Sequence, residues 1–257
     1  MVITQAQILA WLGHFVWPFM RTSGLVLTAP LIGSRYVPAR VRVLVAAALA
    51  LVLAVALPHL PPLPSNPWHL MVYAGGNVVY GATLGFVMWV AVSAITVSGE
   101  MIGLSMGLGF ARLTAPATGT AMPVLSELML WAGLMAYLAA GGPQWLIAAL
   151  YHSFQTNPTG TIAGGGWHAI ALDGGRMFTY GLWLALPVVI AGLAVNAVLG
   201  VVTALAPALN IFSVGFPLLY LMGMWLLLAS SGDIQNVFSH AYGHTITLIE
   251  QLTRAGG

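Results

Sequence analysis

Long runs of apolar residues divide the chain into about six segments that predict helices. The segments cover residues 8–32, 43–57, 70–98, 124–150, 177–206 and 209–230. About 20 apolar residues in a helix cross the ~30 Å hydrocarbon core of a bilayer, and most of the segments reach that length. The second segment extends only about 22 Å, so it either includes residues 37–42 in order to cross a bilayer or sits among protein rather than lipid. The pattern predicts an all-α membrane protein.

Prolines and polar stretches indicate where these helices bend or end. Pro18 and Arg21 interrupt the first segment, while Pro187 and Pro217 lie inside the last two and predict kinks. The connector PHLPPLPSNPW cannot continue a helix, and residues 157–175 have the Gly, Thr and Pro content of a long polar loop. Kinked helices fit a pore-forming assembly better than a simple membrane anchor.

The last part of the chain differs from the apolar segments before it. Between residues 233 and 252, apolar side chains recur at helical spacing and alternate with Gln, Asn and His. This pattern predicts an amphipathic helix that lies on a membrane or packs on a partner.

Arg35, Arg40 and Arg42 form the one cationic cluster, and the positive-inside rule places that loop in the cytoplasm.

Composition supports the membrane assignment and argues against several other classes. Only 5% of the 257 residues are charged, compared with about 25% in an ordinary soluble domain, and 60% are hydrophobic. The net charge of +2 comes from dispersed arginines, so nucleic acid is not an expected partner. The first residues, MVITQAQ, lack a signal-peptide pattern, so we expect the first segment to be retained. Cysteine is absent, which excludes disulfides and thiolate metal sites.

We find no residue pattern that predicts catalysis, a cofactor or a metal. The glycines around Gly103 and Gly107 do not follow a strand, so they do not form a nucleotide loop. His240 and His244 stand one helical turn apart, but no nearby Glu completes a zinc-protease motif. We therefore expect no catalytic residue, no cofactor and no metal site, and we expect that the protein is not an enzyme.

Small residues at regular spacing predict closely packed helices. Gly99, Gly103 and Gly107 repeat every four residues, and Gly81 with Gly85 repeats the spacing upstream. In apolar helices such a strip allows another backbone to approach closely, either within the chain or from another subunit. The residues expected to shape or pack the helices are Gly99, Gly103, Pro187, Asn196, Pro207, Gly215 and Pro217.

Ionisable and polar groups within apolar segments are costly and are therefore candidates for function. Glu100 follows the third segment, Glu127 begins the fourth and Asn196 lies inside the fifth. Two interpretations of the acids stay open. They form structural hydrogen bonds beside a Gly- and Thr-rich stretch, or they couple transport to proton movement.

The stretch between the third and fourth segments, residues 103–123, is predicted to be irregular. It combines glycines, helix-stopping prolines and bulky apolar side chains. Irregular backbone between membrane segments is tolerated where protein encloses it or where it faces a water-filled cavity. One interpretation is a loop whose apolar tip blocks a pore, and the other is a re-entrant loop that only packs. The candidate gate residues are Met106, Gly107, Gly109, Phe110, Leu113, Pro116 and Met122.

Three blocks of the sequence resemble the FliR family of flagellar export proteins. They are WPFMRTSGLVLTAPLIGSRYVPARVRV, GEMIGLSMGLGFARLTAP and VNAVLGVVTALAPALNIFSVGFPL, which keep the family order and span most of residues 11–218. The chain departs from the family at Thr203 and Ala204, where Asn-Arg is common, and at Ala208, where Gln is common. Because Ala204 stands where the family has that arginine, the resemblance implies no charge-pairing role at this position. The central block has Arg112 and Leu113 where the family often has a neutral residue and an aromatic one.

The resemblance implies a fold and a set of partners. It implies one export-gate domain with a FliP-like part, about residues 1–175, fused to a FliQ-like part, about residues 176–257. The chain would assemble with several copies of FliP and FliQ, and later FlhB, in the bacterial inner membrane at the flagellar basal body. Its cargo would be unfolded flagellar proteins, and membrane lipid would contact the assembly. The assembled complex is thought to sit largely above the bilayer plane.

The resemblance also implies that the central loop helps to plug the pore. This role maps onto about residues 106–123, named here the gate segment, with Phe110, Leu113 and Met122 as the obstruction. Two alternatives are the equivalent subunit of a virulence injectisome and a proton-coupled transporter using Glu100 and Glu127. Three ordered family blocks and the lack of an inverted repeat argue against the transporter.

Overall fold

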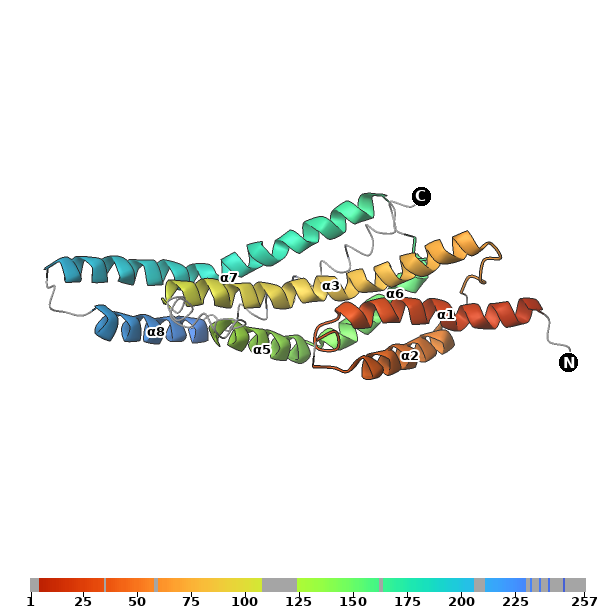
Figure 1. The fold of residues 1–257 in the computed structure, drawn as a ribbon, viewed down its shortest axis with the longest axis horizontal. Coiled ribbons are helices and arrows are strands. Elements are labelled where there is room, and N and C mark those ends of the chain that lie inside the picture. The colour runs from red at the N-terminus through yellow and green to blue at the C-terminus, as the bar shows by residue number, and fades with distance from the viewer. Residues whose placement is uncertain are drawn as a thin grey trace. The chain divides into compact units, whose positions relative to one another are not determined.

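The computed structural model describes residues 5–34, 36–57, 60–107, 124–161, 164–205 and 211–229, together with Gly232, Asn236, His240 and Thr247. Within these residues the chain is all-helical, with seven helices and no strand (Figure 1). The helices are α1 (Gln5–Thr28), α2 (Ala39–Ala56), α3 (Pro67–Ser105), α5 (Val124–Ala139), α6 (Gly142–Thr156), α7 (Gly164–Leu205) and α8 (Ile211–Ala229). The predicted all-α class is therefore confirmed.

The described helices form two compact units, each built from separate stretches of the chain. The first unit contains α1, α2, α6 and the parts of α3 and α7 that end at Val90 and Gly174. The second contains α5, α8 and the parts of α3 and α7 that begin at Ala91 and Gly175. A division into FliP-like and FliQ-like parts at residues 175 and 176 stays a prediction.

The predicted fourth segment is two helices, because the chain turns between α5 and α6. Gly141 has a φ of +76°, a left-handed conformation that glycine adopts at little cost. Pro143 follows in the first turn of α6, where a missing backbone N–H is harmless. The Gly-Pro pair inside an apolar run was therefore the signal for a helix break.

Other predicted boundaries also differ from the structure. α1 continues through Pro18 and Arg21, so the interruption expected there was wrong. α7 begins at Gly164, so most of the loop expected at residues 157–175 is helical. The glycines of that stretch had suggested a loop, but they flank an apolar run that continues the helix. Of the predicted C-terminal amphipathic helix, Asn236, His240 and Thr247 are helical and exposed, and the other residues lie outside the described part.

Three of the described helices are long and apolar enough to cross a membrane. They are Ala39–Ala56, Pro67–Ser105 and Trp167–Leu205, and α5 with α6 would make a fourth if the pair is one span. About two thirds of the most apolar part of α3 is buried within the protein, compared with 17% for α2 and 11% for α7. α3 is therefore a packing core for its neighbours, whereas α2 and α7 turn most of their apolar surface outward.

Glycines bring α1 and α3 into backbone contact in the first unit. A β-carbon added to Gly81 would collide with the carbonyl of Arg21, and one added to Gly24 would collide with the carbonyl of Val78. Only glycine fits at both positions, because its hydrogen leaves room for the facing backbone. The glycine spacing left two interpretations open, packing within the chain or against another subunit. Gly81 packs within the chain.

Candidate functional site

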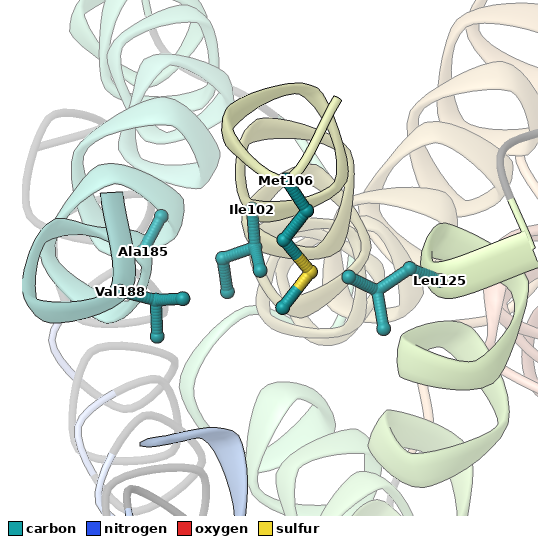
Figure 2. Close-up of a cluster of buried hydrophobic side chains, with 5 residues drawn as sticks. All are labelled: Ile102, Met106, Leu125, Ala185 and Val188. Atoms are coloured by element: carbon teal, nitrogen blue, oxygen red, sulfur yellow. The ribbon is translucent and has the colours of Figure 1, made fainter. Parts of the chain in front are cut away.

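The last turn of α3 lies in an apolar cluster of the second unit. Ile102 and Met106 are almost fully buried and pack with Leu125 of α5 and with Ala185 and Val188 of α7. Figure 2 shows the Met106 side chain between Ile102 and Leu125. Met106 precedes and Leu125 follows residues 108–123, so the chain on the two sides of that stretch meets in one cluster. We call these five residues the Met106 cluster.

A glycine of α8 makes room for Met106. A β-carbon added to Gly223 would overlap the Met106 methyl group and would lie 3.1 Å from its sulfur atom. Leu226 and Leu227 of the same helix pack against the cluster as well. A methionine side chain is flexible and fills irregular space, so the missing side chain at position 223 is what allows α8 to approach the end of α3.

Polar contacts join the end of α3 to α7. The Asn196 side-chain amide donates a 3.4 Å hydrogen bond to the carbonyl of Ser105. The last carbonyls of a helix have no partner within the helix, so Asn196 supplies one donor at this end. Gly192 of α7 also lies beside Ser105, with 3.3 Å between its would-be β-carbon and the Ser105 hydroxyl.

The structure around Ser105 shows that a catalytic motif present in the sequence does not have its usual backbone here. Residues 103–107 are Gly-Leu-Ser-Met-Gly and match the G-x-S-x-G pattern of the nucleophile elbow. Our expectation of no catalytic residue wrongly took this pattern to be absent from the sequence. That motif requires a strand-to-helix turn with an exposed serine. Here Ser105 is the last residue of a helix, and its hydroxyl donates to the Ile102 carbonyl at 2.7 Å. The local backbone is not that of a nucleophile elbow.

The other predicted packing residues are spread over three helices. A β-carbon added to Gly99 would meet the Met129 side chain of α5, and Gly103 is buried. Gly107, two residues after the end of α3, has a φ of +79°, a conformation that favours glycine. Further along the chain, exposed Pro187 and Pro217 lie inside α7 and α8, and Gly215 is buried. Gly109, Phe110, Leu113, Pro116, Met122 and Pro207 lie outside the described residues.

The two predicted acids occupy different environments. Glu127 is exposed in the first turn of α5, where the positive end of the helix dipole favours a carboxylate. Glu100 is half-buried near the end of α3. In the described ranges, no group of three or more His, Asp or Glu side chains has an arrangement that could hold a metal ion.

A second candidate site is centred on Arg21, which we had treated only as a helix interruption. Arg21 is fully buried in the first unit. Its Nε donates to Asn77 Oδ1 at 2.9 Å, Nη1 donates to Ser153 Oγ at 2.9 Å, and Nη2 donates to the Asn157 carbonyl at 2.8 Å. These bonds join α1 to α3, to α6 and to the turn after α6.

Two aromatic rings complete the surroundings of the guanidinium. Its carbon atom lies 3.9 Å from the centre of the Phe154 ring and 4.7 Å from that of Tyr80. Such cation–π contacts are stronger where water is excluded. The signal in the sequence was a charged residue within an apolar segment, which is a functional candidate by default.

The turn after α6 is folded around Asn157 and is held against α3. Asn157 Oδ1 accepts the Gly160 N–H at 2.9 Å, and its amide donates to the Thr161 carbonyl at 2.7 Å. Asn77 donates to the Thr159 carbonyl at 2.9 Å. Gly160 has a φ of +71°, and an added β-carbon would collide with Asn77. The turn, Asn77 and Arg21 therefore form one continuous network, named here the Arg21 network.

Comparison with known proteins identifies relatives along almost the whole chain. The family described as bacterial export proteins, family 1, matches residues 12–245. The flagellar biosynthetic protein FliR of Escherichia coli (strain K12) is 34% identical over 252 residues, which cover 97% of this chain and 96% of that protein. FliR of Pectobacterium carotovorum subsp. carotovorum is 35% identical over 84% of both chains, and FliR of Bacillus subtilis (strain 168) is 28% identical over 93% of both. The matched range includes the Arg21 network and the Met106 cluster.

Proposed function

Because the chain belongs to the FliR family of bacterial export proteins and is a membrane component of the flagellar export apparatus, we propose that it is a subunit of the export gate. In this proposal it forms, with FliP and FliQ homologues and later FlhB, the pore that passes unfolded flagellar proteins. The gate lies in the bacterial inner membrane at the flagellar basal body. The similarity to FliR over 97% of the chain carries this proposal. The relatives compared above are flagellar, which favours this role over one in an injectisome.

Within the gate, we propose that the gate segment obstructs the closed pore and that the Met106 cluster is its base. The cluster supports this role because it holds the chain on both sides of residues 108–123. An anchored base keeps such an obstruction in register with the pore, while its apolar tip, with Phe110, Leu113 and Met122, blocks the passage. Apolar constrictions stop ions by excluding water.

The base has the chemistry that such a closure needs. Its five members are apolar: four lie in α3, α5 and α7, and the fifth, Met106, directly follows α3. Since apolar contacts have no fixed direction, the end of α3 could shift on α8 without breaking hydrogen bonds among these side chains. In this proposal the chain supplies a passage rather than a reaction, and it is not an enzyme.

Removing the gene in its own host tests the role in export. We expect flagellin and hook protein to disappear from the culture medium and swimming to stop, while a plasmid copy of the gene restores both. Normal secretion of flagellar proteins without this chain would contradict the proposal. Loss of an injectisome substrate with unaltered flagellar secretion would instead favour the virulence system.

Deleting residues 109–118 tests the plug separately. We expect assembled complexes with this deletion to leak ions and small solutes, because the obstruction is gone while Met106 and Leu125 remain. Ion flux is measured with complexes reconstituted in liposomes, after native electrophoresis has shown equal assembly. A matched control is Gly200→Ala in α7, where an added β-carbon meets open space. Unaltered permeability of assembled deletion complexes would remove the plug assignment.

A further inference from the structure

Two adjacent glycines, Gly174 and Gly175, lie well inside the long helix α7. Glycine is unfavourable in a helix interior, because it loses more conformational freedom than alanine when it becomes helical. Relative to alanine, each glycine disfavours the helix by roughly fivefold. The pair therefore lowers the stability of α7 at this point of the chain.

Close packing does not require glycine at either position. The glycines that join α1 to α3 make room for a facing backbone, but a β-carbon added to Gly175 would meet none of the described residues within 4 Å. One added to Gly174 would lie 3.4 Å from the tip of the Phe86 ring, which is an ordinary contact. The neighbouring glycines at the start of α3 differ, because a β-carbon added to Gly76 would meet the carbonyl of Gly160.

The pair lies where α7 passes from one compact unit to the other. The first unit includes residues up to Gly174, and the second resumes at Gly175. Burial along the helix changes at the same point. Among residues 167–174, named here the α7 arm, only Asp173 is buried. Beyond the pair, the buried residues of α7 include Gly181, Leu184, Ala185, Val188 and Gly192.

The part of α7 that follows the pair is fixed on α3. A β-carbon added to Gly181 would lie 2.9 Å from the carbonyl oxygen of Ala94, so the two helix backbones touch there. Further along, Ala185 and Val188 belong to the Met106 cluster. A contact between backbones and a buried cluster hold this part in one position, whereas the described contact of Gly174 with α3 is made by the end of a side chain.

Pro187 is the other residue of α7 that favours a bend. Proline removes a backbone hydrogen bond and clashes with the preceding turn, which bends a helix. Ala185 and Val188, on either side of it, are 0% and 1% exposed, so packing holds a bend at Pro187 in place. The glycine pair lacks this restraint, since Gly175 is exposed and Gly174 is half-buried.

From these observations we propose that α7 bends at Gly174–Gly175 during export, and that the α7 arm swings while the later part of α7 stays on α3. A hinge consists of a few residues that absorb a large change in φ and ψ, and glycine does so at the lowest cost. The fixed part carries Ala185 and Val188, so the Met106 cluster keeps its packing while the arm moves. The need for this bend in export rests on the proposed function, whereas the bend itself does not.

Distances between two spin labels in the assembled complex test the bend. The sequence has no cysteine, so Trp167→Cys in the arm and Met135→Cys in α5 place the labels in complexes whose other subunits also lack cysteine. Both positions are more than half exposed, and Met135 lies in the same unit as the fixed part of α7. We expect pulsed dipolar spectroscopy to give a broad or two-peaked distance distribution.

Replacing both glycines by alanine should remove this breadth. Two alanines together favour the straight helix by roughly twenty-five-fold, so we expect Gly174→Ala with Gly175→Ala to leave one narrow peak. The control pair is Trp183→Cys with Met135→Cys. Both of its labels lie beyond the hinge in the second unit, so we expect one narrow peak with or without the alanines.

Secretion tests whether export needs the bend. We expect the double-alanine variant to assemble at the wild-type level on native electrophoresis and to secrete hook protein several-fold more slowly. Gly200→Ala is the matched control, because it makes the same substitution in α7, where an added β-carbon also meets open space. It lies within the second unit, away from the boundary, and should leave secretion unchanged.

Three results would overturn the proposal. Identical distance distributions with and without the alanines would show that the pair is not a hinge. Normal secretion by a variant whose distribution has narrowed would show that export does not need the bend. Loss of assembly by Gly175→Ala alone would show that this glycine makes room for another subunit. None of the three contradicts the role in export, which removal of the gene tests separately.

Discussion

The two units of the protein are built around centres of opposite chemistry. In the first unit, Arg21 joins three elements through directional hydrogen bonds and two aromatic faces. In the second unit, Met106 joins helices through apolar contact, with one long hydrogen bond from Asn196 at the edge. A buried polar network is satisfied in one arrangement, because any group left unpaired is costly. Apolar contacts have no such direction.

This difference suggests a division of roles between the two centres. We interpret the Arg21 network as a fixed frame that defines one arrangement of α1, α3 and α6. We interpret the Met106 cluster as a base that permits small shifts at the start of the gate segment. Changes in the first centre should therefore prevent assembly, whereas changes in the second should alter closure in complexes that still assemble.

The largest effect is expected for Arg21→Met. The variant leaves the acceptors on Asn77, Ser153 and Asn157 buried without their donor, a loss of about 3–5 kcal/mol in the free energy of unfolding. We expect little assembled complex on native electrophoresis. Arg21→Lys keeps the charge but cannot reach three acceptors at once, so it should recover only part of the yield. A wild-type yield for Arg21→Met would show that the network is not a frame.

The next effect is expected for Gly223→Val, which forces Met106 out of its place on α8. Overpacking of this kind costs about 1–3 kcal/mol, and we expect assembled complexes that leak ions in the liposome assay. Adding Met106→Ala removes the collision, so the double variant should recover more than the single effects predict. Additive effects of the two changes would contradict direct contact between residues 106 and 223.

Ser153→Ala tests one bond of the Arg21 network and should have a smaller effect. It removes one acceptor while the other two remain, so we expect a loss of about 1–2 kcal/mol. The measurement is the midpoint of thermal dissociation of the complex. Thr156→Ala, in the same turn of α6 but with only local hydrogen bonds, is the control and should leave the midpoint nearly unchanged.

The smallest effect is expected for Asn196→Ala. Its bond to Ser105 is long and exposed to solvent, and such bonds contribute about 0.5 kcal/mol or less. We expect normal assembly and a slight rise in ion leak, if the end of α3 becomes freer on α7. A collapse of assembly would place Asn196 with the polar frame rather than with the apolar base.

The sequence predicted the helices well where the apolar pattern is uninterrupted. The hydrophobic runs located α2, α3 and α8, because burial in lipid or protein needs such runs whatever the tertiary contacts are. The predicted helix boundaries were wrong where the same residue type can occur either inside a helix or at a helix break. The glycines near the start of α7 suggested a loop but lie in a helix, whereas Gly141 lies at the break between α5 and α6.

The candidate sites were predictable to different degrees. Glycine spacing predicted a close contact at Gly81, but it could not identify the facing carbonyl of Arg21. Arg21 itself stood out as a charge in an apolar run, yet its partners lie 56 to 136 positions away along the chain. The contact between Met106 and Gly223 depends on the packing of two helices, which no local pattern encodes.

The mass of the intact complex tests the central claim most directly. The complex is purified through an affinity tag on this chain and measured by native mass spectrometry. The account predicts a mass that requires several copies of two other small membrane proteins, the FliP and FliQ homologues of the same organism. A chain that purifies alone, or only with copies of itself, would contradict its assignment to the export gate.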